Sequence, residues 1–290
     1  MDKKIKIARL SIFSNLFLIG LKLFTGLVTG SVSILSEAIH SGIDLIASAI
    51  AFFAVKISAK APDKRHPYGH GKFENISGVI EGLLIFVAAF WIIYEAIHKI
   101  AHPSEVKLFQ LAAGVMLISA LVNFFVSRKL YKVAEETDSI ALKADALHLK
   151  TDIYSSIGVG LGMLFIWITG WHILDPVFAI IVALFIMKES FDLTKDAISP
   201  LLDTQVNEKE YQKLHNDISR LTKNRNVEFN HLRSRKSGAT HIIDFTLIVP
   251  PQMTVIDSHD ICDTIESEIK SNYLDTDISI HVEPMQNTVQ

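Results

Sequence analysis

Six long apolar stretches constrain the fold of this chain more than any other feature. At a rise of about 1.5 Å per residue, a helix formed by any of them is long enough to cross a hydrocarbon core of about 30 Å. Inside a bilayer the backbone polar groups must bond to one another, so such segments are expected to be helices. The sequence therefore predicts six transmembrane helices, over residues 8–29, 32–58, 76–100, 107–131, 141–169 and 173–195.

The chain changes character after Pro200, although 49% of its 290 residues are hydrophobic. The apolar runs shorten, and their periodicity predicts a helix, two strands, a helix and a strand. The predicted bounds are 208–223, 227–236, 239–249, 255–272 and 277–283. We therefore expect an α-helical membrane protein with a transmembrane domain over residues 1–203 and a two-layer α+β domain of order αββαβ over residues 204–290.

Basic residues gather at the connections expected on one side of the membrane. They precede the first span and surround the second and fourth connections, whereas the opposite connections carry only Lys99 and Lys107. The positive-inside rule then predicts a multi-pass protein of the cytoplasmic (inner) membrane with both termini in the cytoplasm. The N-terminal apolar run is longer than a signal peptide requires and lacks an Ala-x-Ala site, so we expect it to be retained.

Other classes of partner are disfavoured by the charge and the cysteine content. The formal net charge is -3, and the basic residues form no continuous face, so nucleic acid is not an expected partner. The chain has a single cysteine, Cys262, so it forms no intramolecular disulfide. We interpret Cys262 as a small core residue in a reducing cytosolic setting.

The pattern His-x-x-x-Asp occurs twice inside the apolar stretches, as His40 with Asp44 and as His148 with Asp152. Ionisable residues are costly in a bilayer and usually functional. A spacing of four on a helix places the two side chains of each pair on one face, about 5 to 6 Å apart. Two such helices offer two imidazoles and two carboxylates, a set that suits tetrahedral Zn²⁺. The alternative is that the four side chains only pair with one another.

Two further groups are candidate metal ligands. Asp63, His66 and His70 lie in a connection with Pro67 and two glycines, which indicates a tight loop that brings them together. The alternative is a solvated basic loop whose histidines meet lipid headgroups. The polar domain carries the second group, which metal binding and ordinary surface exposure explain equally well: His231, Asp244, His259, His281 and Glu283. Within the spans, Asn15 and Asn123 are expected to form interhelical hydrogen bonds rather than to bind metal.

Taken together, these patterns resemble the cation diffusion facilitator family of divalent-metal transporters over essentially the whole chain. The resemblance rests on the paired His-x-x-x-Asp, the loop Asp63-x-x-His66-x-x-x-His70-Gly71-Lys72, Leu201-Leu202-Asp203, the run Leu232-Arg233-Ser234-Arg235-Lys236-Ser237-Gly238, His259 and His281-Val282-Glu283. It implies a homodimer of six-helix protomers with metallochaperone-like cytoplasmic domains, and alternating access driven by proton exchange. It also implies a charge interlock between Lys72 and Asp203 that holds the protomers together.

The chain departs from its relatives at two places. Some iron- and zinc-transporting members have Asp where this chain has His40, and manganese exporters have Asn or Asp in place of the histidines. Two imidazoles therefore favour Zn²⁺, while Fe²⁺, Cd²⁺ and Co²⁺ remain alternatives. Asn230 and Thr246 occupy positions that often hold histidines in the cytoplasmic domain of the family, which leaves the number of metals there open.

The expected function is export of Zn²⁺ from the cytoplasm in exchange for protons, because protons compete with metal for imidazole near neutral pH. Zn²⁺ is expected to be the transported ion and also to be bound by the cytoplasmic domain. An intramembrane metalloenzyme is disfavoured, since the sequence has no His-Glu-x-x-His string to supply a general base. A metal-sensing membrane protein without transport remains an alternative, although it does not need a complete intramembrane quartet.

Overall fold

The computed structural model describes residues 3–29, 32–101, 109–169, 173–273 and 275–285. Within these ranges the backbone of His40 is described, but its side chain lies outside the described part. The chain divides into two compact units, Met1–Ile198 and Ser199–Gln290, each of which is described here by itself.

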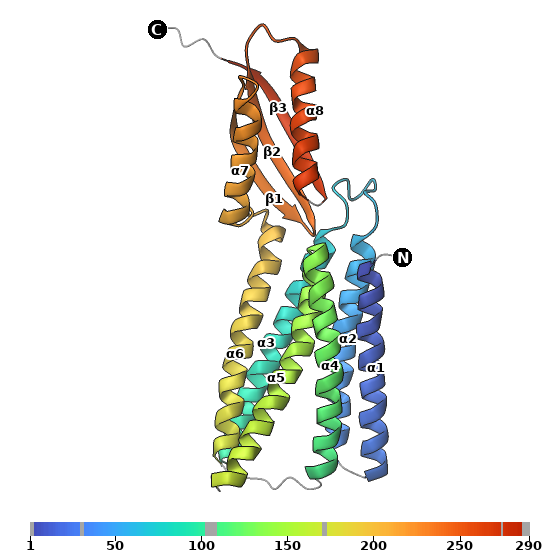
Figure 1. Cartoon of the computed structure of the whole chain (residues 1–290). Coiled ribbons are helices and arrows are strands. Elements are labelled where there is room, and N and C mark those ends of the chain that lie inside the picture. Colours follow the sequence, from blue (N-terminus) through green and yellow to red (C-terminus); the bar gives the residue numbers. More distant parts are fainter. Residues whose placement is uncertain (1–2, 30–31, 102–108, 170–172, 274, 286–290) are drawn as a thin grey trace. The chain divides into compact units, whose positions relative to one another are not determined.

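Six long helices make up the first unit (Figure 1). They agree with the six predicted spans, and the largest differences lie at the ends, where α1 and α3 begin earlier and α4 ends later than hydropathy predicted. Polar residues at those ends, such as Glu74 and Glu136, continue the helices beyond the apolar runs. The helices are α1 Lys3–Thr29, α2 Val32–Ser58, α3 Lys72–Ala101, α4 Phe109–Thr137, α5 Ile140–Thr169 and α6 Leu174–Ile198.

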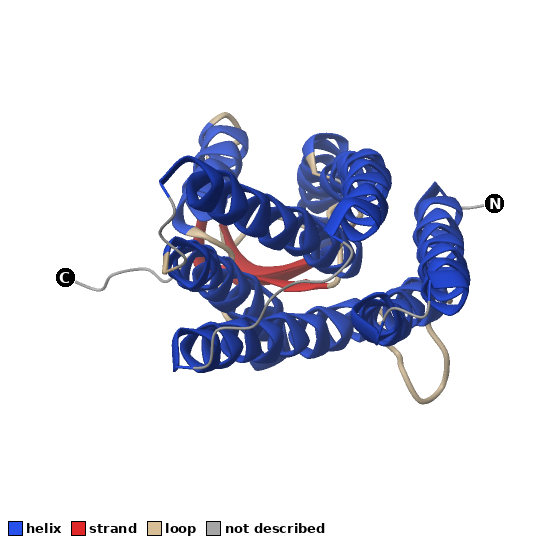
Figure 2. Ribbon diagram, turned by 90° about the horizontal axis from the view of Figure 1, so that it is seen from below, coloured by secondary structure: helices blue, strands red, loops and turns tan. Residues whose placement is uncertain are grey.

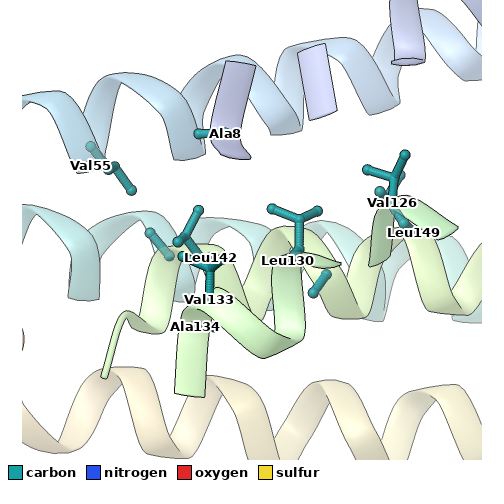
Figure 3. Packing of buried hydrophobic residues seen from close by; sticks show 11 residues of the cluster. Ala8, Val55, Val126, Leu130, Val133, Ala134, Leu142 and Leu149 are labelled. Atoms are coloured by element: carbon teal, nitrogen blue, oxygen red, sulfur yellow. The ribbon is translucent and has the colours of Figure 1, made fainter. Parts of the chain in front are cut away.

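The helices of this unit pack mainly in pairs, α1 with α2, α3 with α6, and α4 with α5. Figure 2 views the bundle close to the helix axes. One apolar cluster joins α1, α2, α4 and α5, and Figure 3 shows its members side by side. Several of them are alanines, including Ala8 and Ala134, which let the helices approach closely.

The outer surface of the helices is strongly apolar. Phe24 is 69% exposed, Leu27 66% and Trp91 65%. Contiguous exposure of such side chains is unusual on a soluble protein and normal against lipid. Two of the described helices, over Lys3–Val28 and Lys72–His98, also meet the length and mean hydropathy of a membrane span by themselves. The exposed surface and these two helices fit a membrane domain.

The second unit has the predicted order αββαβ after a short 3-10 turn. Strand β2 lies in the middle of the sheet, antiparallel to β1 and parallel to β3. Asn207 and Thr254 cap α7 and α8 by accepting hydrogen bonds from backbone N–H groups in their first turns. The elements are η1 Ser199–Leu202, α7 Glu208–Lys223, β1 Glu228–Ser237, β2 Thr240–Val249, α8 Val255–Asn272 and β3 Thr276–Pro284.

The core of this unit lies between the sheet and its two helices. Ile243, Phe245 and Leu247 alternate along β2 and pack with Ile218 of α7 and Ile265 of α8. Both helices therefore contribute to one apolar core against β2. Cys262 is 7% exposed and belongs to the same core, which confirms its interpretation as a small packed residue.

Candidate metal site

Asp44 of α2 meets His148 and Asp152 of α5 in the interior of the bundle. Asp44 Oδ1 lies 3.0 Å from His148 Nε2. One ligand atom from each of the three residues lies within 4.8 Å of the others. Asp44 and His148 are each 5% exposed, and Asp152 is half-buried. The structure thus brings together three of the four residues expected from the repeated pattern; the fourth is His40, of whose side chain nothing is described.

The spacing of four along α5 explains how one helix supplies two ligands. His148 and Asp152 lie one turn apart and on the same face. Thr151 between them donates its hydroxyl to the backbone carbonyl of His148, so it does not compete for the site. The cluster is therefore built by α5 on one side and by α2 on the other.

Two asparagines tie this cluster to neighbouring helices. Asn123 Nδ2 of α4 donates to Asp152 Oδ2 at 3.3 Å. Asn15 Nδ2 of α1 donates to Ser48 Oγ of α2 at 2.7 Å and to the backbone carbonyl of Asp44 at 3.4 Å. The interhelical bonds predicted for both asparagines are therefore confirmed. A bond of this kind orients a carboxylate before an ion binds.

The donor set fits a small divalent cation. His148 offers Nε2, and its Nδ1 is buried with no hydrogen-bond partner in the described part of the chain. Two carboxylates and a neutral imidazole suit Zn²⁺ and related transition metals. A carboxylate as buried as Asp44 needs a positive partner, and either a bound cation or a proton on His148 supplies one. Metal and proton can thus replace each other at one point.

Asp63, His66 and His70 form a second cluster in the loop between α2 and α3, with ligand atoms again within 4.8 Å of one another. Asp63 Oδ1 accepts the backbone N–H groups of His66 at 2.7 Å and Arg65 at 2.8 Å. These two bonds lower the pKa of Asp63. Asp63 Oδ2 lies 3.4 Å from His70 Nε2, and the two imidazole rings are 4.4 Å apart. The predicted convergence of the three residues is therefore observed.

The backbone of this loop explains the convergence. Gly69 adopts a φ of 82° and donates its N–H to the carbonyl of His66, which closes a turn. His70 is 7% exposed, whereas His66 lies at the surface. The turn carries His70 inward beneath His66, and both stay within reach of Asp63.

The candidate ligands of the second unit are spread over several elements. His259 pairs with Asp263 at 3.7 Å, and His281 with Glu283 at 3.3 Å. His231 has a φ of 53° at an irregularity of β1, and Asp244 lies opposite Arg233. Among the residues that the structure describes, no three of this set meet within a single chain. Metal binding by this set stays a prediction.

The two departures from the family pattern are neighbours in the sheet. Asn230 of β1 pairs in register with Thr246 of β2, which pairs with His281 of β3. One histidine therefore stands in a row that otherwise holds an amide and a hydroxyl. This row is where the family resemblance leads one to expect further imidazoles.

Lys72 and Asp203 belong to different units, so their predicted interlock stays a prediction. Within the second unit, Asp203 Oδ1 accepts a hydrogen bond from Arg235 Nη1 at 3.0 Å.

Sequence reasoning gave no role to three fully buried acids, Glu74, Glu81 and Asp145. The signal available in the sequence was the presence of carboxyl groups within or next to the predicted spans.

The six long helices with their apolar outer surface, the buried cluster of candidate metal ligands and the separate α+β unit define a helical membrane protein with a candidate site for a divalent cation. Comparison with known families identifies it further: the cation efflux transmembrane domain matches residues 8–202, and the cytoplasmic domain of cation efflux proteins matches residues 206–285. The chain belongs to the cation diffusion facilitator family. Members of this family are metal efflux transporters and not enzymes.

Relatives match the chain over almost its whole length. An uncharacterized transporter of Synechocystis sp. is 33% identical over 280 residues, covering 97% of this chain and 90% of the relative. The cation-efflux pump FieF of Shewanella oneidensis is 30% identical and covers 98% and 96%. The manganese efflux system protein MneP of Bacillus subtilis is 30% identical and covers 96% and 95%.

Proposed function

We propose that this protein exports Zn²⁺ from the cytoplasm in exchange for protons. The observation that carries the proposal is the contact of 3.0 Å between Asp44 and His148, with Asp152 in reach of the same point. His40 completes the transport site by its spacing in the sequence. A buried, mixed imidazole and carboxylate site binds a divalent metal when its histidines are neutral and releases the metal when they are protonated.

The choice of Zn²⁺ rests on the imidazoles. His148 presents nitrogen to the cluster, and His40 offers a second nitrogen where some relatives carry carboxylate. Nitrogen ligands favour Zn²⁺ over a hard cation such as Mn²⁺. Fe²⁺, Cd²⁺ and Co²⁺ are the alternatives. The name of one similar protein gives manganese as the metal, and the names of the other two give no metal.

The proposal includes an assembly and an orientation. The protein is a homodimer of the cytoplasmic (inner) membrane with both termini in the cytoplasm. Lys72 and Asp203 contribute to the contact between protomers. The loop cluster of Asp63, His66 and His70 and the histidines of the cytoplasmic domain bind Zn²⁺ as additional sites.

Reconstituted vesicles test the proposal most directly. Purified protein in proteoliposomes with an imposed pH gradient should move Zn²⁺ faster than the other metals, and proton flux should accompany it. Asp152→Ala should abolish both fluxes. Asp192→Ala, which changes an exposed carboxyl of α6, is the matched control and should transport normally.

Two results would contradict the proposal. Normal flux through Asp152→Ala would exclude the proposed transport site. Metal binding without any flux in the unmodified protein would favour the alternative of a metal-sensing membrane protein without transport. Flux that favours another metal would keep the site and replace Zn²⁺ as its cargo.

A further inference from the structure

Glu74, in the first turn of α3, is 1% exposed although it carries a carboxyl group. Its Oε1 accepts hydrogen bonds from Lys4 Nζ of α1 at 3.0 Å and from Ser58 Oγ of α2 at 2.7 Å. Its Oε2 accepts one from Ser139, the residue that precedes α5. One carboxylate is therefore bonded to the ends of three other helices. Bonds to an ionised acceptor are the stronger class of hydrogen bond.

One of these partners lies on a helix that carries a candidate metal ligand, and another directly precedes the second such helix. Ser58 is the last residue of α2, which bears Asp44. Ser139 precedes α5, which bears His148 and Asp152. Glu74 thus fastens together the ends of α2 and α5 that, in the proposed orientation, face the cytoplasm.

Between this end and the cluster of candidate metal ligands, α2 and α5 are held together at two further levels. An apolar layer comes first, and Figure 3 shows part of it. Nearer the ligands, Ser48 Oγ of α2 donates to Asp145 Oδ1 of α5 at 2.8 Å. Ser48 lies one turn from Asp44, and Asp145 lies about one turn from His148. The apolar layer contains Ala8, Ala54, Val55, Ala141 and Leu142.

An ion that moves from the cytoplasm to Asp44 along this interface must separate α2 from α5. The apolar layer has no ligand for a cation, so it cannot conduct one while it remains packed. The outermost contact in its way is the set of bonds to Glu74. The helices cannot part at this end unless that set breaks.

The backbone of Glu74 is joined to the loop that carries the second candidate metal cluster. Glu74 N donates to the carbonyl of Gly71 at 3.1 Å, and Phe73 N donates to the carbonyl of His70 at 3.1 Å. His70 is two residues from the start of α3. These two bonds connect the loop at His70 directly to the first turn of α3 and to the backbone of Glu74.

From these contacts we infer that Glu74 is the latch of a cytoplasmic gate, a positioning residue that holds α2 and α5 together until the loop at His70 moves. The direction of opening rests on the proposed function. The latch itself rests on the bonds of Glu74 to Lys4, Ser58 and Ser139.

A cysteine reporter in the apolar layer tests the latch. The only native cysteine is removed by Cys262→Ala, and Ala54, which is 7% exposed, is replaced by Cys. The rate at which a methanethiosulfonate reagent modifies this cysteine is measured on the purified full chain in detergent. Glu74→Gln should raise the rate about tenfold, equivalent to about 1.4 kcal/mol of gate closure. An unchanged rate would overturn the inference.

Matched lysines provide the first control. Lys4→Met removes a partner of Glu74 and should also speed the reaction of the reporter. Lys3→Met should not, because Lys3 pairs with Glu136 instead. Equal rates for the two variants would overturn the role of the Lys4 bond.

A second reporter separates gate opening from general loosening of the fold. Ala197 of α6 is 0% exposed, and it faces Gly78 of α3. Ala197 is replaced by Cys in a second reporter protein. The methanethiosulfonate reagent should modify this cysteine equally slowly whether residue 74 is Glu or is changed by Glu74→Gln. Acceleration at both reporters would mean that the bundle had loosened, and it would contradict a local latch.

Transport measures the link to the loop. Zn²⁺ flux of His70→Ala, Glu74→Gln and the double variant forms a double-mutant cycle. If the loop acts through the latch, the two effects are not additive, and additive effects would overturn that link. If neither the parent protein nor any of the variants transports Zn²⁺, the proposed function fails. The labelling rates of the cysteine reporters still decide in that case whether Glu74 is a latch.

Discussion

Asp44 and His148 are 104 residues apart in the chain, yet Asp44 Oδ1 and His148 Nε2 lie 3.0 Å from each other in the interior of the bundle. The contact joins α2 to α5, and Asp152 lies beside it. A pair made of one carboxylate and one imidazole can hold a proton when no metal is present. The same two groups can then exchange that proton for a metal ion.

The charge of Asp44 should be required for metal binding. Asp44→Asn keeps the shape of the side chain but offers a neutral oxygen, so the affinity for Zn²⁺ should fall by at least about tenfold, or about 1.4 kcal/mol. Equilibrium dialysis of the purified protein measures this change, with the loop histidines and the candidate histidines of the cytoplasmic domain replaced in both samples. Undiminished binding would exclude Asp44 as a ligand.

Asn123 should matter through Asp152. Its amide donates to Asp152 Oδ2, and loss of a bond that orients a ligand commonly costs about 10- to 100-fold in metal affinity or activity. We expect Asn123→Ala to reduce Zn²⁺ transport by that order. Ser127→Ala, one turn along α4, is the matched control because Ser127 bonds only the carbonyl of Phe124 among the contacts described. Equal transport by both variants would contradict this role.

His40 should set the choice of metal. His40→Asp replaces the nitrogen ligand proposed at this position by oxygen and should broaden transport toward Fe²⁺ or Cd²⁺ relative to Zn²⁺. Initial rates for each metal in the same proteoliposomes give the ratio. A profile identical to that of the parent protein would argue that selectivity lies elsewhere.

Cys262 should react slowly with alkylating reagents, and the pH dependence should show why. Burial is the main cause that raises the pKa of its thiol, and the nearby Glu266 and Asp263 act in the same direction. The folded chain therefore favours the neutral thiol. The free energy of unfolding falls as the pH rises from the pKa of this thiol in the unfolded chain to its higher pKa in the folded chain. The rate of modification by iodoacetamide, followed by mass spectrometry from pH 7 to 10, should rise at a higher pH than in denatured protein. Coinciding curves would contradict a buried thiol.

Much of the fold could be read from local patterns. The apolar runs predicted α1 to α6, and alternation in the polar part predicted β2. The structure shows that Ile243, Phe245 and Leu247 form the buried face of this strand. The tight loop predicted from Pro67, Gly69 and Gly71 was confirmed by the convergence of His66 and His70. These features depend on neighbours within a few residues, which is why the sequence reveals them.

Contacts between distant residues were harder to predict. Asn123 was expected to bond another helix, but the sequence did not say that its partner was Asp152. Glu74 received no role at all, because its three partners come from α1, α2 and the start of α5. The histidines of the second unit are the opposite case, since their types suggested a cluster that the described part of one chain does not contain.

The amino-acid sequence by itself determined which segments leave water and which face of each ligand helix carries its pair, because helix period and hydrophobicity are local properties. The tertiary structure alone decided that α2 faces α5 at Asp44 and His148, and that Glu74 closes the same interface at its end. The physical reason is that lipid is as apolar as the helix surfaces, so hydrophobicity cannot choose between neighbours. Close packing and the pairing of buried polar groups make that choice.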